Sequence, residues 1–144
     1  MTDAIRHELD VAGPPDVAFE VFTLGMGRWW DPAYSPDPAT YDGIAIAPEV
    51  GAELSMVHGE EAFTFGTVLV WEPGSRYVQT FSLAMDPAHP STLEVTFTPA
   101  GSGCHVKFAH GGWSEENQAS RSKYGDWPHL LKRYADAVAA AWSG

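Results

Sequence analysis

The sequence predicts an α+β fold in which a curved antiparallel β-sheet of about seven strands wraps around a long C-terminal helix, with a short helical pair after the first strand. Strand-like segments follow one another from residue 43 to residue 110, separated by short turn signals. Aromatic side chains gather on one face of these strands, and an apolar stripe of helical period occupies residues 127–142. Because neither apolar surface can stay exposed to water, the helix is expected to cover the aromatic face of the sheet.

The composition restricts the architecture and the partners. A chain of 144 residues is expected to form one domain, residues 1–144. Its formal net charge of −11 argues against nucleic acid and against an anionic membrane surface as partners. The one cysteine cannot form an internal disulfide, and the sequence shows no apolar leader and no apolar run of membrane-spanning length. A cytoplasmic location is therefore expected.

The first third of the chain predicts one strand and a short helical pair. Polar and apolar side chains alternate over residues 5–11, which predicts a strand that ends at the Gly-Pro-Pro turn of residues 13–15. Residues 16–22 have the apolar spacing of a short helix after a proline start. Residues 28–31 are expected to add a short helical or turn segment, and the prolines of residues 32–38 exclude regular structure after it.

The middle of the chain predicts an antiparallel meander, because every separator between its strands is a short turn signal. Strands are expected at residues 43–47, 52–58, 62–72, 75–84, 91–99 and 103–110. Side chains of like parity are expected to share the aromatic face, namely Phe63, Phe65, Leu69 and Trp71 in one strand and Tyr77, Gln79, Phe81 and Leu83 in the next.

The C-terminal part predicts helix. Ser114 is suited to be an N-cap, with Glu115 and Glu116 in the first turn, where the helix dipole favours acidic side chains. After Gly125, Asp126 is suited to cap a second start. A helix of about 15 residues is expected from there, with a buried stripe formed by Trp127, Leu131, Tyr134, Val138 and Trp142.

A curved sheet packed against a helix often leaves a cavity, and aromatic rings would line it here. The candidate lining residues are Trp29, Trp30, Phe65, Trp71, Phe81, Phe97, Phe108, Trp113, Trp127, Leu131 and Tyr134. Gln79, His110, Arg121 and Tyr124 would supply the few polar contacts. For any single ring, a plain role in filling the core is the better expectation, whereas for the set as a whole the two roles are more evenly balanced.

Catalytic and metal-binding patterns are absent from the sequence. His110 is a candidate polar contact at one end of the cavity, but a structural histidine that fixes the turn before the last helix is the stronger expectation. His58 with Glu60 and Glu61 is expected to form a solvated hairpin rather than a metal site. Cys104 is expected to be a small buried residue rather than a nucleophile. No catalytic residue, no metal and no cofactor is therefore predicted.

Several motifs now combine into a resemblance. Residues 66–73 read Gly-Thr-Val-Leu-Val-Trp-Glu-Pro and precede Arg-Tyr-Val, and residues 92–97 read Thr-Leu-Glu-Val-Thr-Phe. The most specific motif is His-Gly-Gly-Trp at residues 110–113. Trp127 with Leu130 and Leu131, the segment 11–19 and the Trp29-Trp30 pair complete the set. These motifs resemble, in order and spacing over nearly the whole chain, the heat-shock-protein-ninety ATPase activator homologue family.

The resemblance implies the helix-grip fold of the SRPBCC superfamily, which is also called START-like or birch-pollen-allergen-like. The chain departs from the family pattern at two positions. Asp126 stands immediately before Trp127, where family members usually have glycine, and Gln79 replaces a more usual aromatic or aliphatic side chain. Both departures place a polar group near the expected cavity, so the ligand preferences of the family do not transfer directly.

Three functional hypotheses follow. The leading one is binding of a small hydrophobic or aromatic molecule, lipid-like or polyketide-like, in the cavity under the last helix. The second is a cyclase-like or aromatase-like enzyme that uses the same cavity, with His110, Tyr124 or Glu94 as acid or base. The third, implied by the family resemblance, is a co-chaperone-like interaction module with a role in stress response. A homodimer is compatible with the sequence, which shows no direct sign of one.

Overall fold

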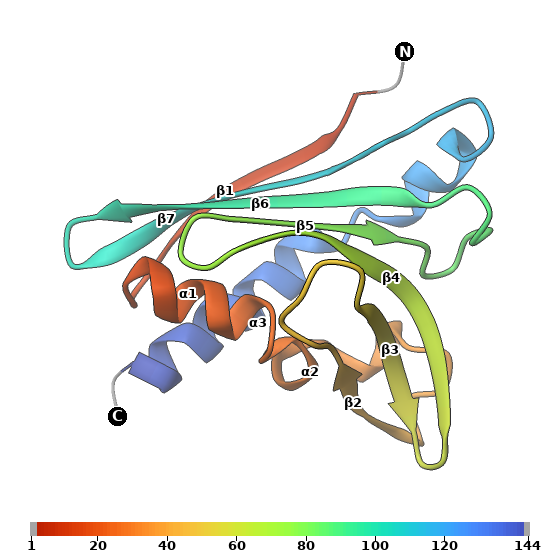
Figure 1. The fold of residues 1–144 in the computed structure, drawn as a ribbon, viewed down its shortest axis with the longest axis horizontal. Coiled ribbons are helices and arrows are strands. Elements are labelled where there is room, and N and C mark those ends of the chain that lie inside the picture. Colours follow the sequence, from red (N-terminus) through yellow and green to blue (C-terminus); the bar gives the residue numbers. More distant parts are fainter. Residues whose placement is uncertain (1–2, 143–144) are drawn as a thin grey trace.

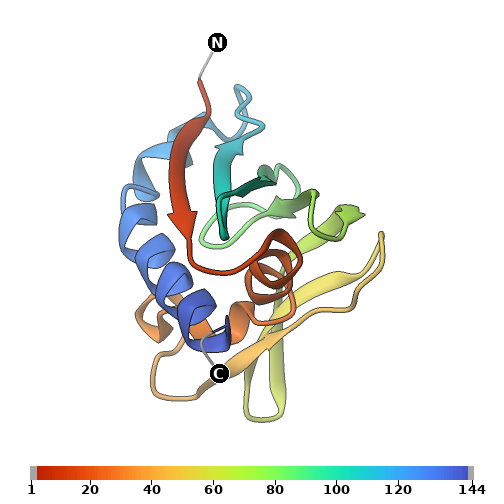
Figure 2. The ribbon, with the colours of Figure 1, turned by 90° about the vertical axis from the view of Figure 1, so that its left-hand side faces the viewer.

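The structure is a computed structural model that describes residues 3–142 (Figure 1). Its elements in chain order are β1 (Ile5–Val11), α1 (Pro15–Phe22), α2 (Met26–Trp29), the 3₁₀ turn η1 (Pro32–Tyr34), β2 (Tyr41–Ala45), β3 (Glu53–His58), β4 (Glu61–Glu72), β5 (Arg76–Phe81), β6 (Ser91–Ala100), β7 (Gly103–Gly111), the 3₁₀ segment η2 (Gln118–Lys123) and α3 (Trp127–Trp142). The strands form one antiparallel sheet in the order β1-β7-β6-β5-β4-β3-β2. The sheet curls around α3, and α1 lies on the same side, so the predicted α+β fold is confirmed (Figure 2).

The core fills the space between the concave face of the sheet and the helices. Most of its largest fully buried side chains are aromatic, and they come from α1, α2, the strands and α3 alike. Tyr134 of α3 is completely buried, and its hydroxyl donates to the carbonyl of Ala18 in α1 at 2.7 Å. Cys104 is buried and free, and burial raises the pKa of its thiol, as expected of a small core residue. None of the helices within residues 3–142 is both long enough and apolar enough to cross a membrane.

The strand β4 departs from the predicted parity. Phe65 is buried, but Phe63 and Leu69 expose 41% and 44% of their surface, so the expectation that they share the buried face with Trp71 is wrong. The register slips once against β3 and once against β5. Each slip is a bulge that moves the following side chains to the other face of the sheet.

Two further expectations need correction near the ends of elements. The strand predicted over residues 75–84 ends at Phe81, so Leu83 and Ala84 lie in the loop that follows. No helix begins at Ser114; instead, its N–H donates to Asn117 Oδ1 at 2.8 Å, and its carbonyl accepts the N–H of Gln118 at 2.8 Å. These two bonds close a turn. The side-chain amide of Asn117 also donates to three carbonyls of neighbouring loops, and these bonds anchor the segment in a non-helical conformation.

Candidate functional site

A pocket of about 470 Å³ opens between the start of α3 and two loops, at one end of the aromatic core. Its walls come from the segment around η1, from the end of β5 and the loop after it, from the end of η2, and from the first turn of α3. The lining residues are Trp30, Ala33, Tyr34, Ser35, Pro36, Phe81, Leu83, Ala84, Lys123, Tyr124, Asp126, Trp127 and Leu130. This volume lies in the range of pockets that hold small organic ligands.

The floor of the pocket consists of three buried rings that contact one another. The ring centroid of Trp127 lies 5.9 Å from that of Trp30 and 5.8 Å from that of Phe81. Tyr124 packs edge-on against Phe81 with centroids 5.6 Å apart. The three floor rings expose only 1–3% of their surface and close the inner end of the pocket, whereas Tyr124 is half-buried.

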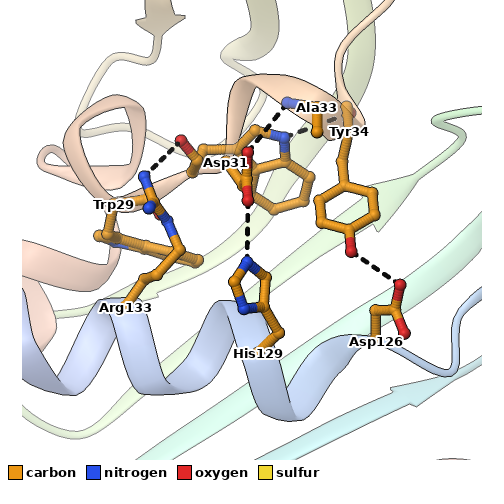
Figure 3. A network of polar contacts seen from close by, with 8 residues as sticks. Trp29, Asp31, Ala33, Tyr34, Asp126, His129 and Arg133 are labelled. Atoms are coloured by element: carbon orange, nitrogen blue, oxygen red, sulfur yellow. Dashed lines mark hydrogen bonds and ion pairs between the residues drawn. The ribbon is translucent and has the colours of Figure 1, made fainter.

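One wall, the segment from Trp29 to Tyr34, is fastened to α3 by side chains (Figure 3). Arg133 Nε donates to the carbonyl oxygen of Trp29 at 2.7 Å, and His129 Nε2 lies 2.8 Å from Asp31 Oδ2. The hydroxyl of Tyr34 donates to Asp126 Oδ2 at 2.7 Å.

The contacts of this wall shift the pKa values of two of its side chains. The N–H of Ala33, followed by the ring of His129, lowers the pKa of the Asp31 carboxyl. The Asp126 carboxylate raises the pKa of the Tyr34 phenol, because it accepts the phenolic proton in a hydrogen bond. The wall is therefore held by charge-assisted bonds rather than by apolar packing alone.

The opposite wall, formed by residues 83–84, is fastened to η2 and the residue that follows it. The Tyr124 hydroxyl donates to the carbonyl of Leu83 at 2.6 Å, and Lys123 Nζ donates to the carbonyl of Ala84 at 2.7 Å. Burial raises the pKa of Tyr124 to about 12, so its phenol stays protonated at neutral pH. Both walls thus depend on one short stretch of chain, residues 123–133, in which Gly125 separates the two sets of contacts.

His110 lies behind the pocket and is completely buried. The indole N–H of Trp127 can only donate, so His110 Nδ1 accepts it, at 3.1 Å. His110 Nε2 therefore carries the proton and donates to Ser91 Oγ at 2.7 Å, and Ser91 in turn donates to the carbonyl of Phe81 at 2.8 Å. Burial, with a smaller effect of Arg121, lowers the pKa of His110 to about 3. Both ring nitrogens are occupied within the protein, and the imidazole is neutral.

The predicted lining residues occupy three positions relative to the pocket. Trp30, Phe81, Tyr124 and Trp127 line it. Behind them lie residues that contact these rings: Phe65, Phe108, His110 and Trp113. The remaining predicted residues do not line the pocket: Trp29, Trp71, Gln79, Phe97, Leu131 and Tyr134. Gln79 is buried, and its side chain accepts the Tyr77 hydroxyl at 2.8 Å and donates to the Thr80 carbonyl at 3.0 Å.

Several lining residues carry no signal in the sequence. The polar ones are Tyr34, Ser35 and Lys123, whereas Asp126 was expected near the cavity and does line the pocket. The three prolines of residues 32–38 correctly indicate a loop, but nothing local shows that this loop folds back onto the last helix. Arg121, which was expected to provide a polar contact, instead donates to the carbonyl of Asp3 at 2.8 Å and is not a lining residue.

The other candidate side chains lie outside the pocket. Within residues 3–142, no three His, Cys, Asp or Glu side chains come together in a way that could hold a metal ion. The hairpin expected at His58, Glu60 and Glu61 is present and both glutamates are exposed, but His58 is only 6% exposed and packs against Tyr41 and Phe63. Glu94 lies on the outer side of the sheet, where its carboxylate accepts Arg76 Nε at 2.7 Å.

Comparisons with known structures agree with this architecture. The structure of the Aha1 dimer from Colwellia psychrerythraea matches with a TM-score of 0.69 at 18% sequence identity, over 96% of each chain. Norcoclaurine synthase from Thalictrum flavum matches with a TM-score of 0.60 at 19% identity, over 98% of this chain and 86% of that one. A search of curated protein sequences gives no significant match.

A third structure has a higher sequence identity. It is the anthrahydroquino-gamma-pyrone synthase Txn09 in complex with a compound designated SUM, which is 26% identical over 94% of this chain and 97% of that one, with a TM-score of 0.63. The model of the family described as "Activator of Hsp90 ATPase homolog 1-like protein" matches residues 12–139, which include every residue that lines the pocket. The chain therefore belongs to the family of Activator of Hsp90 ATPase homolog 1-like proteins.

Proposed function

We propose that this protein binds a small hydrophobic aromatic molecule, polyketide-like or lipid-like, in the pocket between α3 and the two fastened loops. One observation carries the proposal: an open pocket of about 470 Å³ has a floor of buried aromatic rings and a rim with few polar groups. Apolar pockets with a small number of placed polar groups are the usual form of small-molecule sites. A closely packed protein interior contains only small voids. The pocket is much larger than such voids and is wide enough for a ligand.

Related structures support the proposal. Txn09 was solved in complex with a small molecule and is named as a synthase of a fused-ring product. Norcoclaurine synthase has the same fold and is named for a small-molecule product. These two names associate the architecture with small-molecule chemistry, and the aromatic floor of the pocket is suited to a flat ring system.

The geometry favours binding over turnover. His110 has both nitrogens engaged and stays neutral, Glu94 is paired with Arg76 on the outer side of the sheet, and Cys104 is buried. None of the three lines the pocket. A serine, threonine or cysteine next to a base is a usual sign of covalent catalysis, and Ser35, the one such residue in the lining, donates its hydroxyl to the carbonyl of Pro32 at 2.7 Å.

Calorimetric titration with a neutral fused-ring probe, anthraquinone-2-carboxamide, tests the proposal. The variant Ala33→Phe places a ring into the pocket and is expected to weaken binding at least about tenfold, because the volume it occupies is lost to the ligand. Ala139→Phe is the matched control, because Ala139 is exposed on α3 and does not line the pocket. Equal affinities of the wild type and Ala33→Phe, or no binding of this probe and of a broad panel of aromatics and lipids, would refute the proposal.

A cyclase-like enzyme is the second candidate, and one observation favours it. The hydrogen-bonded pair of Tyr34 and Asp126 lines the pocket and joins a proton donor to a carboxylate base. Incubation with aromatic polyketide precursors would test this candidate. Product formation that is abolished in Asp126→Asn but retained in Asp136→Asn, an exposed carboxylate on α3, would support an enzyme.

The partners, location and domain organisation are further proposals. We propose that residues 1–144 act as one cytoplasmic domain that works as a monomer or as a homodimer. The related Aha1 protein from Colwellia psychrerythraea was solved as a dimer, which supports testing dimerisation by light scattering. A co-chaperone role rests on the family name alone, and a pull-down with the heat-shock ATPase would test it.

A further inference from the structure

The rim of the pocket carries opposite charges at its two ends. Lys123 and Asp126 both line the pocket and lie on either side of Tyr124 and Gly125 in the chain. The protein as a whole has a formal net charge of −11, so a cation at the rim stands out against an acidic background. A ligand with a polar group would therefore bind in one preferred orientation.

The ammonium group of Lys123 is held in place without being neutralised. Its Nζ donates to the carbonyl oxygen of Ala84 at 2.7 Å, which uses one of its three donors and leaves the charge uncompensated. Within residues 3–142, no carboxylate forms an ion pair with it. By contrast, Lys132 on α3 pairs with Asp136 at 3.2 Å.

The residue that holds this ammonium is itself unusual. Ala84 has a φ of 63°, and it is the only residue other than glycine in residues 3–142 with a positive φ. This backbone conformation is strained for a residue with a Cβ atom. Strain of this kind gathers where chains hold ligands, and Ala84 lines the pocket.

The other end of the rim carries the opposite charge, because, in the described part of the chain, the Asp126 carboxylate is not paired with a cation either. It accepts the hydroxyl of Tyr34 at 2.7 Å, a neutral donor that leaves its negative charge in place. An anionic group would be repelled there and attracted towards Lys123. The charges of the rim therefore favour an acidic group at the Lys123 end.

We propose that Lys123 determines the specificity of the pocket. The ligand is a flat fused-ring aromatic with an acidic group, either a carboxylate or an ionised enol, and this group accepts hydrogen bonds from the Lys123 ammonium. The inference rests on the proposed function, because it requires a ligand in this pocket. The aromatic rings of the ligand contact the floor formed by Trp30, Phe81 and Trp127, and the acidic group stays at the rim. Because Lys123 is exposed, its bond to the ligand is partly screened by water, and its loss should weaken binding roughly three- to tenfold.

A pair of nearly isosteric probes tests this assignment. Anthraquinone-2-carboxylate and anthraquinone-2-carboxamide have similar shapes and differ in charge, and calorimetry gives the Kd of each. The wild type is expected to bind the carboxylate roughly three- to tenfold more tightly than the carboxamide, and this preference should shrink as salt is added. Lys123→Met also removes the bond to Ala84, so it can weaken the binding of both probes, but it should weaken carboxylate binding more and thereby abolish the preference. Lys132→Met, the matched control on α3, should retain the preference.

The outcomes separate the two proposals. Equal affinities of the wild type for both probes, or an equal loss for both in Lys123→Met, would overturn the role of Lys123 while leaving the binding function intact. If neither probe binds, the proposed function fails and this inference fails with it.

Discussion

Titration of His110 should control much of the acid sensitivity of the fold. The ring is completely buried, and both of its nitrogens are hydrogen-bonded in the neutral form, which lowers its pKa to about 3 from the ordinary value of 6.5. Below pH 6.5 the unfolded chain binds a proton at this ring, whereas the folded chain does not. The contribution of His110 to the free energy of unfolding is therefore highest above pH 6.5 and decreases progressively as the pH falls from 6.5 towards 3.

The size of the effect follows from the pKa difference. Each pH unit well between the two values contributes about 1.4 kcal/mol, and the unfolded ring is already half protonated at pH 6.5, so acidification from pH 6.5 to 4.5 should remove about 2.3 kcal/mol of unfolding free energy at this residue alone. Urea unfolding of the wild type and of His110→Gln, followed from pH 7 to 4.5, measures the difference in pH dependence. If the variant does not fold, the ¹H and ¹³C ring resonances of His110 in the wild type provide the same information. A His110 midpoint near 6.5, or identical pH dependence of the two proteins, would refute the reasoning.

Three further predictions concern other polar contacts. Ser91→Ala removes the hydroxyl that joins His110 to the Phe81 carbonyl and should cost about 1–3 kcal/mol in urea unfolding, whereas Ser102→Ala in the exposed hairpin should cost little. Arg133→Met removes donors to two backbone carbonyls of the pocket wall. It should lower the unfolding free energy by about 1–2 kcal/mol and speed amide hydrogen exchange in residues 29–34. Unchanged exchange in these residues would contradict the fastening of this wall. His105 lies 2.8 Å from a carboxylate oxygen of Glu8 and of Asp10, which raises its pKa. The stabilisation by His105 should therefore be present below pH 6.5 and be lost as the pH rises through the raised pKa, so His105→Gln should lose stability only on the acidic side.

The strands and the last helix were predictable because their signals are local. Short turns such as Pro73-Gly74 and Gly101-Ser102-Gly103 separate segments of alternating or continuous apolar character, and the structure places a strand on each side of both turns. The helical stripe from Trp127 to Val138 likewise depends only on its own spacing, and α3 begins at Trp127. The expectation that Trp142 belongs to the buried stripe is wrong, because 53% of its surface is exposed at the end of the helix. The bulges of β4 were not predictable, because they depend on how neighbouring strands pair rather than on the order of residues within β4.

The pocket was predictable only in its aromatic floor. Its polar wall depends on pairs that are far apart in the chain: Tyr34 and Asp126 are 92 residues apart, and Arg133 is 104 residues from Trp29. A single sequence contains no local pattern that announces such pairs. For the same reason, the sequence alone does not identify the hydrogen-bond partners of His110, because only the fold brings Ser91 and Trp127 to either side of its ring.

Because both walls of the pocket are attached to residues 123–133, that stretch can act as an exchangeable module. Lys123 and Tyr124 hold residues 83–84, and Asp126, His129 and Arg133 hold residues 29–34. Transplanting residues 123–133 from a relative would move both attachments together and reshape the two walls at once, while the sheet behind them stayed the same. Three of these attachments end on the backbone carbonyls of Trp29, Leu83 and Ala84 and need no particular side chain there. A change at Asp126 or His129, by contrast, requires a matching change at Tyr34 or Asp31.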